Sequence, residues 1–183
     1  MPREQLRKFP LFTLPRVPLF QDARLRDWAQ KLTRALEIAR DPYTVGARVT
    51  RVTNQTITQN TTTAVQWTAT DYDNGGLFTS TLNTRLTAPI SGIYGVTATS
   101  KWDVSATGAR QLRLLLNGAT TFAHVREAGD TEPAHCIATF MNLASGDYVE
   151  TVVRHNAGAD LALTPTSALP MYFAMHWLSP LQE

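Results

Sequence analysis

The sequence predicts a mainly β protein, in which an antiparallel body follows an extended arm and one α-helix. Beyond residue 43, apolar and polar residues alternate in short runs, and turn-forming pairs such as Asn117-Gly118 separate those runs. Threonine, which favours strands, fills nine of the 21 positions from Thr50 to Thr70. Many short strands at near-regular spacing are typical of a sandwich or a barrel.

Residues 1–21 are expected to form the extended arm. Prolines at positions 2, 10, 15 and 18 preclude a regular helix. The arm also carries large apolar side chains that an extended chain cannot bury within itself, and these are the expected docking residues: Phe9, Leu11, Phe12, Leu14, Leu19 and Phe20. We expect the arm to dock in a groove of a partner or of its own trimer, and the alternative is a strap across the protein's own body.

Residues 22–42 are expected to form an amphipathic helix, over about 23–40, and a short linker. Asp22 is a suitable N-cap, and Asp41-Pro42 is a suitable stop. Apolar residues recur at spacings of three and four, which places one stripe along the helix. The residues expected to pack are Leu25, Trp28, Leu32 and Leu36. This stripe could pack against its own copies, on a partner or on the β body.

The basic surplus lies entirely in the first quarter of the chain. Residues 1–42 carry nine Lys/Arg and five Asp/Glu, a net +4, whereas residues 43–183 carry eight and ten, a net −2. A basic N-terminal segment before a near-neutral body indicates contact with an acidic surface. The arginines of the arm do not cluster, so nucleic acid is not the expected partner. No run of 18 apolar residues occurs, and neither a membrane span nor a signal peptide is expected.

Residues 43–183 are expected to form the β body and to carry the trimer contacts. Trp67 and Trp177 are expected in its core because they lie in alternating runs. Trp102, beside charged residues, is expected to be half-exposed at a strand end, where it could stack on a sugar or pack against a neighbouring subunit. Cys136 is the single cysteine, so no intrachain disulfide is possible, and it is expected to be a small buried residue.

Four phrases of the body follow the order of a known family. They are Thr-Ala-Pro-Ile-Ser-Gly-Ile-Tyr at 87–94, Asn-Gly at 117–118, Leu-Ala-Ser-Gly-Asp-Tyr-Val at 143–149 and Phe-Ala-Met-His-Trp-Leu at 173–178. Through them the body resembles the globular-head domain of complement-type collagenous proteins, which shares the tumour-necrosis-factor jelly roll. The resemblance implies a two-sheet antiparallel jelly roll of about ten strands that trimerises about a three-fold axis.

The phrases also supply the expected structural residues of the body. These are Pro89, Gly92, Tyr94, Asn117, Gly118, Gly146 and Asp147. Pro89 is expected to fix the chain before a turn, and Gly92 to adopt a positive φ ahead of a core strand. Two features depart from the family: no Gly-X-Y repeat precedes the body, and Met175 stands where the family usually has glycine.

No enzyme signature is present, and we expect no catalytic residue, metal or cofactor. The sequence lacks a Gly-x-Ser-x-Gly elbow, a phosphate loop and a His-Glu-x-x-His motif. The segment 71–75 resembles the start of a calcium loop, but Leu82 stands where such a loop needs its bidentate glutamate. The four histidines follow no ligand spacing.

The layout of an N-terminal peptide and helix before a jelly roll is similar to that of small virion proteins of tailed phages. We therefore expect a non-enzymatic structural virion protein, assembled in the host cytoplasm. It would be a homotrimer anchored to a larger virion protein such as a capsid, portal, neck or tail protein, in the role of a capsid decoration, head fibre or attachment protein. The alternative is a fibre-tip module that binds a host receptor or glycan.

Overall fold

The computed structural model describes residues 28–29, 31–32, 45–128 and 133–181. The chain divides into two units, Met1–Pro42 and Tyr43–Glu183. In the first unit the described residues, 28–29 and 31–32, are helical. The rest of the predicted helix and the whole predicted arm, with their expected packing and docking residues, lie outside the described residues and stay predictions. No helix in the described ranges is long and apolar enough to cross a membrane.

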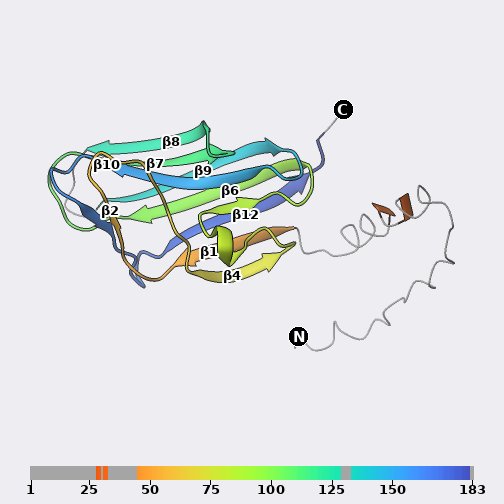
Figure 1. Ribbon diagram of the computed structural model, residues 1–183, viewed down its shortest axis with the longest axis horizontal. Coiled ribbons are helices and arrows are strands. Elements are labelled where there is room, and N and C mark those ends of the chain that lie inside the picture. The colour runs from red at the N-terminus through yellow and green to blue at the C-terminus, as the bar shows by residue number, and fades with distance from the viewer. Residues whose placement is uncertain (1–27, 30, 33–44, 129–132, 182–183) are drawn as a thin grey trace. The chain divides into compact units, whose positions relative to one another are not determined.

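Ten of the twelve strands described in residues 45–128 and 133–181 form two five-stranded sheets, and every pairing among them is antiparallel (Figure 1). The first sheet has the order β4-β1-β12-β6-β9, with bounds Ala69–Asn74, Gly46–Arg51, Met171–Ser179, Gly92–Lys101 and Ala134–Leu143. In the second sheet, β3 (Thr63–Ala64), β10 (Tyr148–His155), β7 (Ala109–Leu116) and β8 (Thr120–Ala128) follow in that order, and β5 (Arg85–Thr87) also pairs with β10.

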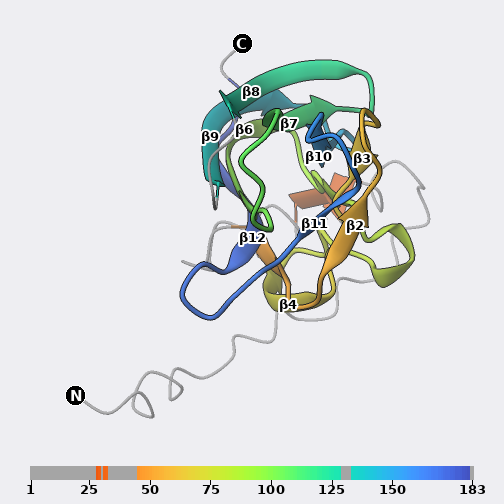
Figure 2. The ribbon, with the colours of Figure 1, turned by 90° about the vertical axis from the view of Figure 1, so that its left-hand side faces the viewer.

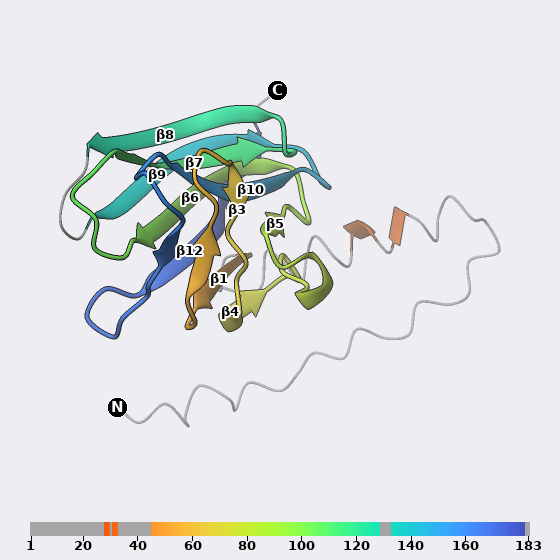
Figure 3. The ribbon, with the colours of Figure 1, turned by 60° about the vertical axis from the view of Figure 1, so that its left-hand side comes forward.

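The remaining strands, β2 (Gln55–Ile57) and β11 (Leu161–Leu163), form a two-stranded ribbon, and one 3-10 turn, η2, spans Ser80–Leu82. Figure 2 shows the two sheets from one end, with β9 and β8 close together and the ribbon on the other side. Strands that are distant in the sequence lie side by side within a sheet, as β1 and β12 do. Figure 3 shows the two sheets as layers. The predicted two-sheet jelly roll is confirmed.

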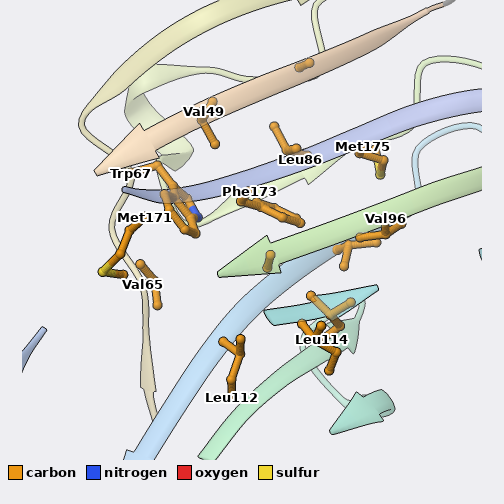
Figure 4. Close-up of a cluster of buried hydrophobic side chains, with 14 of the residues drawn as sticks. Val49, Val65, Trp67, Leu86, Val96, Leu112, Leu114, Met171, Phe173 and Met175 are labelled. Atoms are coloured by element: carbon orange, nitrogen blue, oxygen red, sulfur yellow. The ribbon is translucent and has the colours of Figure 1, made fainter. Parts of the chain in front are cut away.

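The core lies between the two sheets and follows from the alternation of their strands. Leu112 and Leu114 of β7 and Phe173 of β12 point inward and are fully buried, whereas their neighbours along each strand face outward (Figure 4). Trp67 is 1 % exposed, and its ring centroid lies 5.7 Å from that of Phe173. The core place predicted for Trp67 is thus confirmed, and Trp177 packs against the same core while half-buried.

Two tight turns lie where the sequence predicts them. Asn117 and Gly118 have φ values of 51° and 70° and join β7 to β8, as an Asn-Gly hairpin requires. Gly146 has φ 95° in the turn between β9 and β10. Asn117 connects the two turns: its amide Nδ2 donates to Asp147 Oδ1 at 2.9 Å, and Tyr148 N donates to Asn117 Oδ1 at 2.9 Å.

The positive φ expected for Gly92 is wrong. Gly92 is not among the glycines of positive φ; it lies in β6 opposite Leu143. A Cβ atom at this position would lie 2.1 Å from Trp177 Nε1 and 2.6 Å from the Ser179 carbonyl oxygen. The glycine is therefore needed because another strand approaches closely, and not because of a special backbone angle.

Two further expectations about single residues are also wrong. Cys136 is exposed, because β9 turns Ile137 inward and leaves Cys136 on the outer face. Trp102 is fully buried: it forms a bridge to Leu163 of β11, and its ring meets His155 edge-on at a centroid distance of 5.3 Å. Trp102 thus closes one end of the core and offers no face to a sugar.

Both ends of the described body lie at the same end of the sandwich. Gly46, the first residue of β1, pairs with His176 near the end of β12, whereas Arg51 pairs with Met171 at the opposite end. The loops at that opposite end include 102–108, between β6 and β7, and 164–170, before β12 (Figure 1).

Candidate self-association surface

The outer face of the first sheet is built by the residues that alternate with the core. Register places them in cross-strand rows. One row runs from Gly46 through His176 and Gly95 to Phe140, and the next contains Tyr72, Arg48, Ala174, Thr97 and Ala138. Glycine, alanine and threonine residues alternate in these rows with the larger His176 and Arg48, and Phe140 and Tyr72 stand on the two border strands.

The half of this face over β6 and β9 is apolar. Phe140 is 72 % exposed, and Leu178 beside it is 48 % exposed. A Cβ placed on Gly95 would lie 3.5 Å from Leu178 and 3.8 Å from Phe140, so these two side chains flank the glycine. A hollow of about 430 Å³ lies over Gly95, Thr97 and Ala138, with Phe140 at its border. An exposed aromatic side chain next to a hollow floored by small residues is a feature of interaction sites.

The half over β4, β1 and β12 is aromatic and polar. The Tyr72 hydroxyl and His176 Nε2 are 2.7 Å apart, and burial lowers the pKa of His176 while it raises that of Tyr72. The Arg48 guanidinium lies 4.4 Å above the Tyr172 ring, and its Nε is 3.1 Å from Asp71 Oδ2. These side chains contact one another within the chain, so this half of the face is held in place by its own interactions.

The His176 ring can lie flat against the sheet because the residue opposite it on β1 is a glycine, Gly46. A Cβ on Gly46 would lie 2.5 Å from His176 Cδ2, so the imidazole ring occupies the space that a side chain would fill. The ring is then held against the sheet and within reach of Tyr72. Together the two halves, which we call the β6–β12 face, present a continuous surface with few free charges.

Sequence reasoning did not single out Phe140 or Leu178. The signal was present in the sequence, because Phe140 precedes Met141 and Leu178 follows Trp177. Adjacent large apolar residues in a strand point to opposite faces and predict burial of both. Phe140 and Leu178 are nevertheless exposed in the described chain, which marks them as a candidate interaction patch.

The segment that resembles a calcium loop has a structural role. Asp73 accepts hydrogen bonds from Leu77 N at 2.9 Å and from Phe78 N at 3.1 Å, which closes the turn after β4. In the part of the chain that the structure describes, no three His, Cys, Asp or Glu residues gather as metal ligands would. His135 and His155 are buried, and His155 Nε2 lies 2.8 Å from the Ile57 carbonyl oxygen.

The residues carried by the sequence phrases lie at the turns and in the core. Tyr94 is fully buried, and its hydroxyl donates to the Ile90 carbonyl oxygen at 2.7 Å. The Pro89 carbonyl oxygen accepts a hydrogen bond from Ser145 Oγ at 2.9 Å, which connects the turn before β6 to the turn after β9. The pKa of Asp147 is lowered, first by the hydrogen bond from Asn117 and then by that from Ala144 N. This group stabilises the fold and lies apart from the apolar half of the face.

No protein-family model matches the chain, and no curated protein sequence matches it significantly. Solved structures do match. Eiger TNF from S. frugiperda superposes with a TM-score of 0.59 at 13 % identity, covering 76 % of this chain and 96 % of that one. Murine APRIL at pH 5.0 gives a TM-score of 0.56 at 16 % identity, with 74 % and 100 % coverage. The body of this chain therefore has the tumour-necrosis-factor-like β-jelly-roll fold.

Proposed function

We propose that the chain is a non-enzymatic structural protein that forms a homotrimer through the β6–β12 face and is anchored to a larger particle by residues 1–42. The observation that carries this proposal is Phe140, which is 72 % exposed beside a hollow lined by small residues. Placing such a ring against a second copy removes it from water. The jelly-roll fold and the low content of charged residues, 17 %, support self-association through a sheet face.

Phe140→Ser tests this proposal in the full-length chain. Burying a phenylalanine contributes roughly 1.5–3 kcal/mol, so the exposed part of Phe140 contributes about 1–2 kcal/mol per copy. Summed over three copies, its loss should raise the concentration at which trimers dissociate by about ten- to a hundredfold. Light scattering should give three times the chain mass of 20.3 kDa for the wild type and a lower mass for the variant.

Phe122→Ser is the matched control. Phe122 is 44 % exposed on β8, in the second sheet, so this change removes the same side chain from a different surface. It should leave the trimer mass unchanged. A monomeric wild type, or equal losses from both variants, would contradict self-association through the β6–β12 face.

We infer further that the larger particle is the virion of a tailed phage and that the arm provides the attachment. This inference rests on the apolar, proline-rich segment 1–21 followed by a helix-forming segment, as in the sequence analysis. Deleting residues 2–21 should leave the melting temperature of the body nearly unchanged and abolish co-sedimentation with the particles. If the deletion instead unfolds the body, the arm is an internal strap.

The second candidate function is a head that binds a receptor or glycan. It would use a different surface, the outer face of the second sheet, and one arrangement of charges on that surface favours it.

A further inference from the structure

Four arginines gather on the outer face of the second sheet. Arg113 stands between the buried residues Leu112 and Leu114, so it points away from the core. The same alternation turns Arg85, Arg126 and Arg154 outward from β5, β8 and β10. Register places Gln111 between Arg126 and Arg154 in one cross-strand row, and with strands about 4.8 Å apart these two arginines are about 10 Å from each other.

Polar or aromatic groups hold three of these guanidinium groups, and no carboxylate among the described residues forms an ion pair with them. Arg113 Nη2 donates to Thr62 Oγ1 at 2.9 Å, Arg154 Nε donates to the Asn60 carbonyl oxygen at 3.1 Å, and the Arg85 guanidinium lies 4.1 Å above the Tyr148 ring. Within the described ranges none of the four forms a salt bridge. Their positions are therefore fixed while their charges stay available.

This face is basic, although the body as a whole carries a net negative charge. Residues 43–183 carry eight basic and ten acidic residues, yet four of the eight basic residues lie here. Glu150 is the acidic residue that register places among them, opposite Arg85, and it accepts a hydrogen bond from Thr84 Oγ1 at 2.7 Å. No two of the four are directly opposite, but Arg113 lies diagonally next to both Arg126 and Arg154, where like charges repel and do not favour folding.

We propose that this arginine face binds an acidic polysaccharide. A guanidinium group presents a planar set of donors that matches carboxylate, sulfate and phosphate oxygens, and four such groups on one face, three of them held in place, suit a ligand with repeated negative groups. The Gln111 amide lies between Arg126 and Arg154 and can bind sugar hydroxyl groups. Arg85 covers one face of the Tyr148 ring, which makes this ring less open to stacking on a base, and the amide between the arginines favours a polysaccharide over a nucleic acid.

The arginine face and the β6–β12 face belong to different sheets, whose outer surfaces point away from each other (Figure 2). Self-association through one sheet therefore leaves the arginines of the other accessible. A trimer would carry three such faces, and a long polysaccharide that reaches more than one of them would bind more tightly by avidity.

Binding of the full-length protein to immobilised heparin and polygalacturonate tests the proposal, with dextran as the neutral polymer and a single-stranded oligonucleotide as the other polyanion. Heparin and polygalacturonate should bind, and binding should weaken as sodium chloride rises. Arg126→Gln with Arg154→Gln should weaken both by about tenfold or more. Arg126→Gln alone should weaken them less, and in the described structure Arg126 makes no hydrogen bond or ion pair whose loss could unfold the protein.

Thr53→Glu with Ser167→Glu is the control, since it changes the net charge by the same amount at exposed loop positions outside the second sheet. It should leave both affinities nearly unchanged. The proposal is overturned if the control weakens binding as much as the arginine variants do, or if the arginine variants bind like the wild type. Tighter binding of the oligonucleotide than of the polysaccharides would overturn it in favour of a nucleic-acid partner.

Discussion

Gly92→Ala is expected to destabilise the body although it adds only one methyl group. The new Cβ would lie 2.1 Å from Trp177 Nε1 and 2.6 Å from the Ser179 carbonyl oxygen, both far inside van der Waals contact. The indole ring is rigid and packs against the core, and the carbonyl belongs to β12, so neither can move without disturbing its strand. Overpacking of this kind costs about 1–3 kcal/mol, or a fall in melting temperature of roughly 4–12 °C for a body of this size.

Urea unfolding would measure the effect, at concentrations where light scattering gives one oligomeric state for every variant. Gly95→Ala is the matched control, because a Cβ there meets its nearest neighbour at an ordinary 3.5 Å. Trp177→Leu removes the indole ring, so Gly92→Ala should lower the free energy of unfolding by less in a protein that also carries Trp177→Leu. The close contact with the Ser179 carbonyl oxygen should preserve part of the loss. Equal stabilities of the two alanine variants, or an unchanged cost beside Leu at 177, would refute the close-approach reasoning.

Two further predictions concern buried groups that titrate. Tyr94→Phe should lower the free energy of unfolding by about 1 kcal/mol, because the hydrogen bond to Ile90 is lost. Burial raises the pKa of Tyr94 to about 12, above the unfolded value of 10.0, so the wild type should lose stability as the pH rises from 10 towards 12 and the variant should lose less. Burial also lowers the pKa of His135 below 6.5, and this effect prevails over the opposing charge of Glu127, 3.4 Å away. The unfolded state then takes up the proton first, so stability is complete above pH 6.5 and falls below it; His135→Gln should flatten that fall in urea titrations, and an unchanged pH profile would contradict the assignment.

The strands and hairpins were predictable because their signals are local. Asn117-Gly118 and Gly146 mark turns by residues that tolerate a positive φ, and alternation marks the strands between them. The use of Gly92 was not predictable, since the Trp177 ring that excludes a side chain there lies on β12, far along the chain. Trp102 was misplaced for the same reason, because β11 covers it only after the chain has folded back.

The candidate surfaces depend on register, which the sequence does not reveal. In β9 both alternating rows contain apolar residues, so periodicity alone could not tell that Cys136 and Phe140 face outward while Ile137 faces the core. The arginine face is a stronger case, because Arg85, Arg113, Arg126 and Arg154 come from four separate strands. Only the pairing of those strands makes them neighbours.

Because Gly46 pairs with His176, β1 begins at the end of the sandwich where β12 finishes, and this difference between the two ends can be used in engineering. A protein fused to the C-terminal side of β12 would begin at the same end of the sandwich as the start of β1. A peptide inserted between Ser167 and Ala168 would instead be displayed from the opposite end, in an exposed loop outside the strands. The 164–170 loop is thus the better position for a reporter epitope or a display cargo, because it lies at the end of the sandwich opposite the start of β1 and the end of β12.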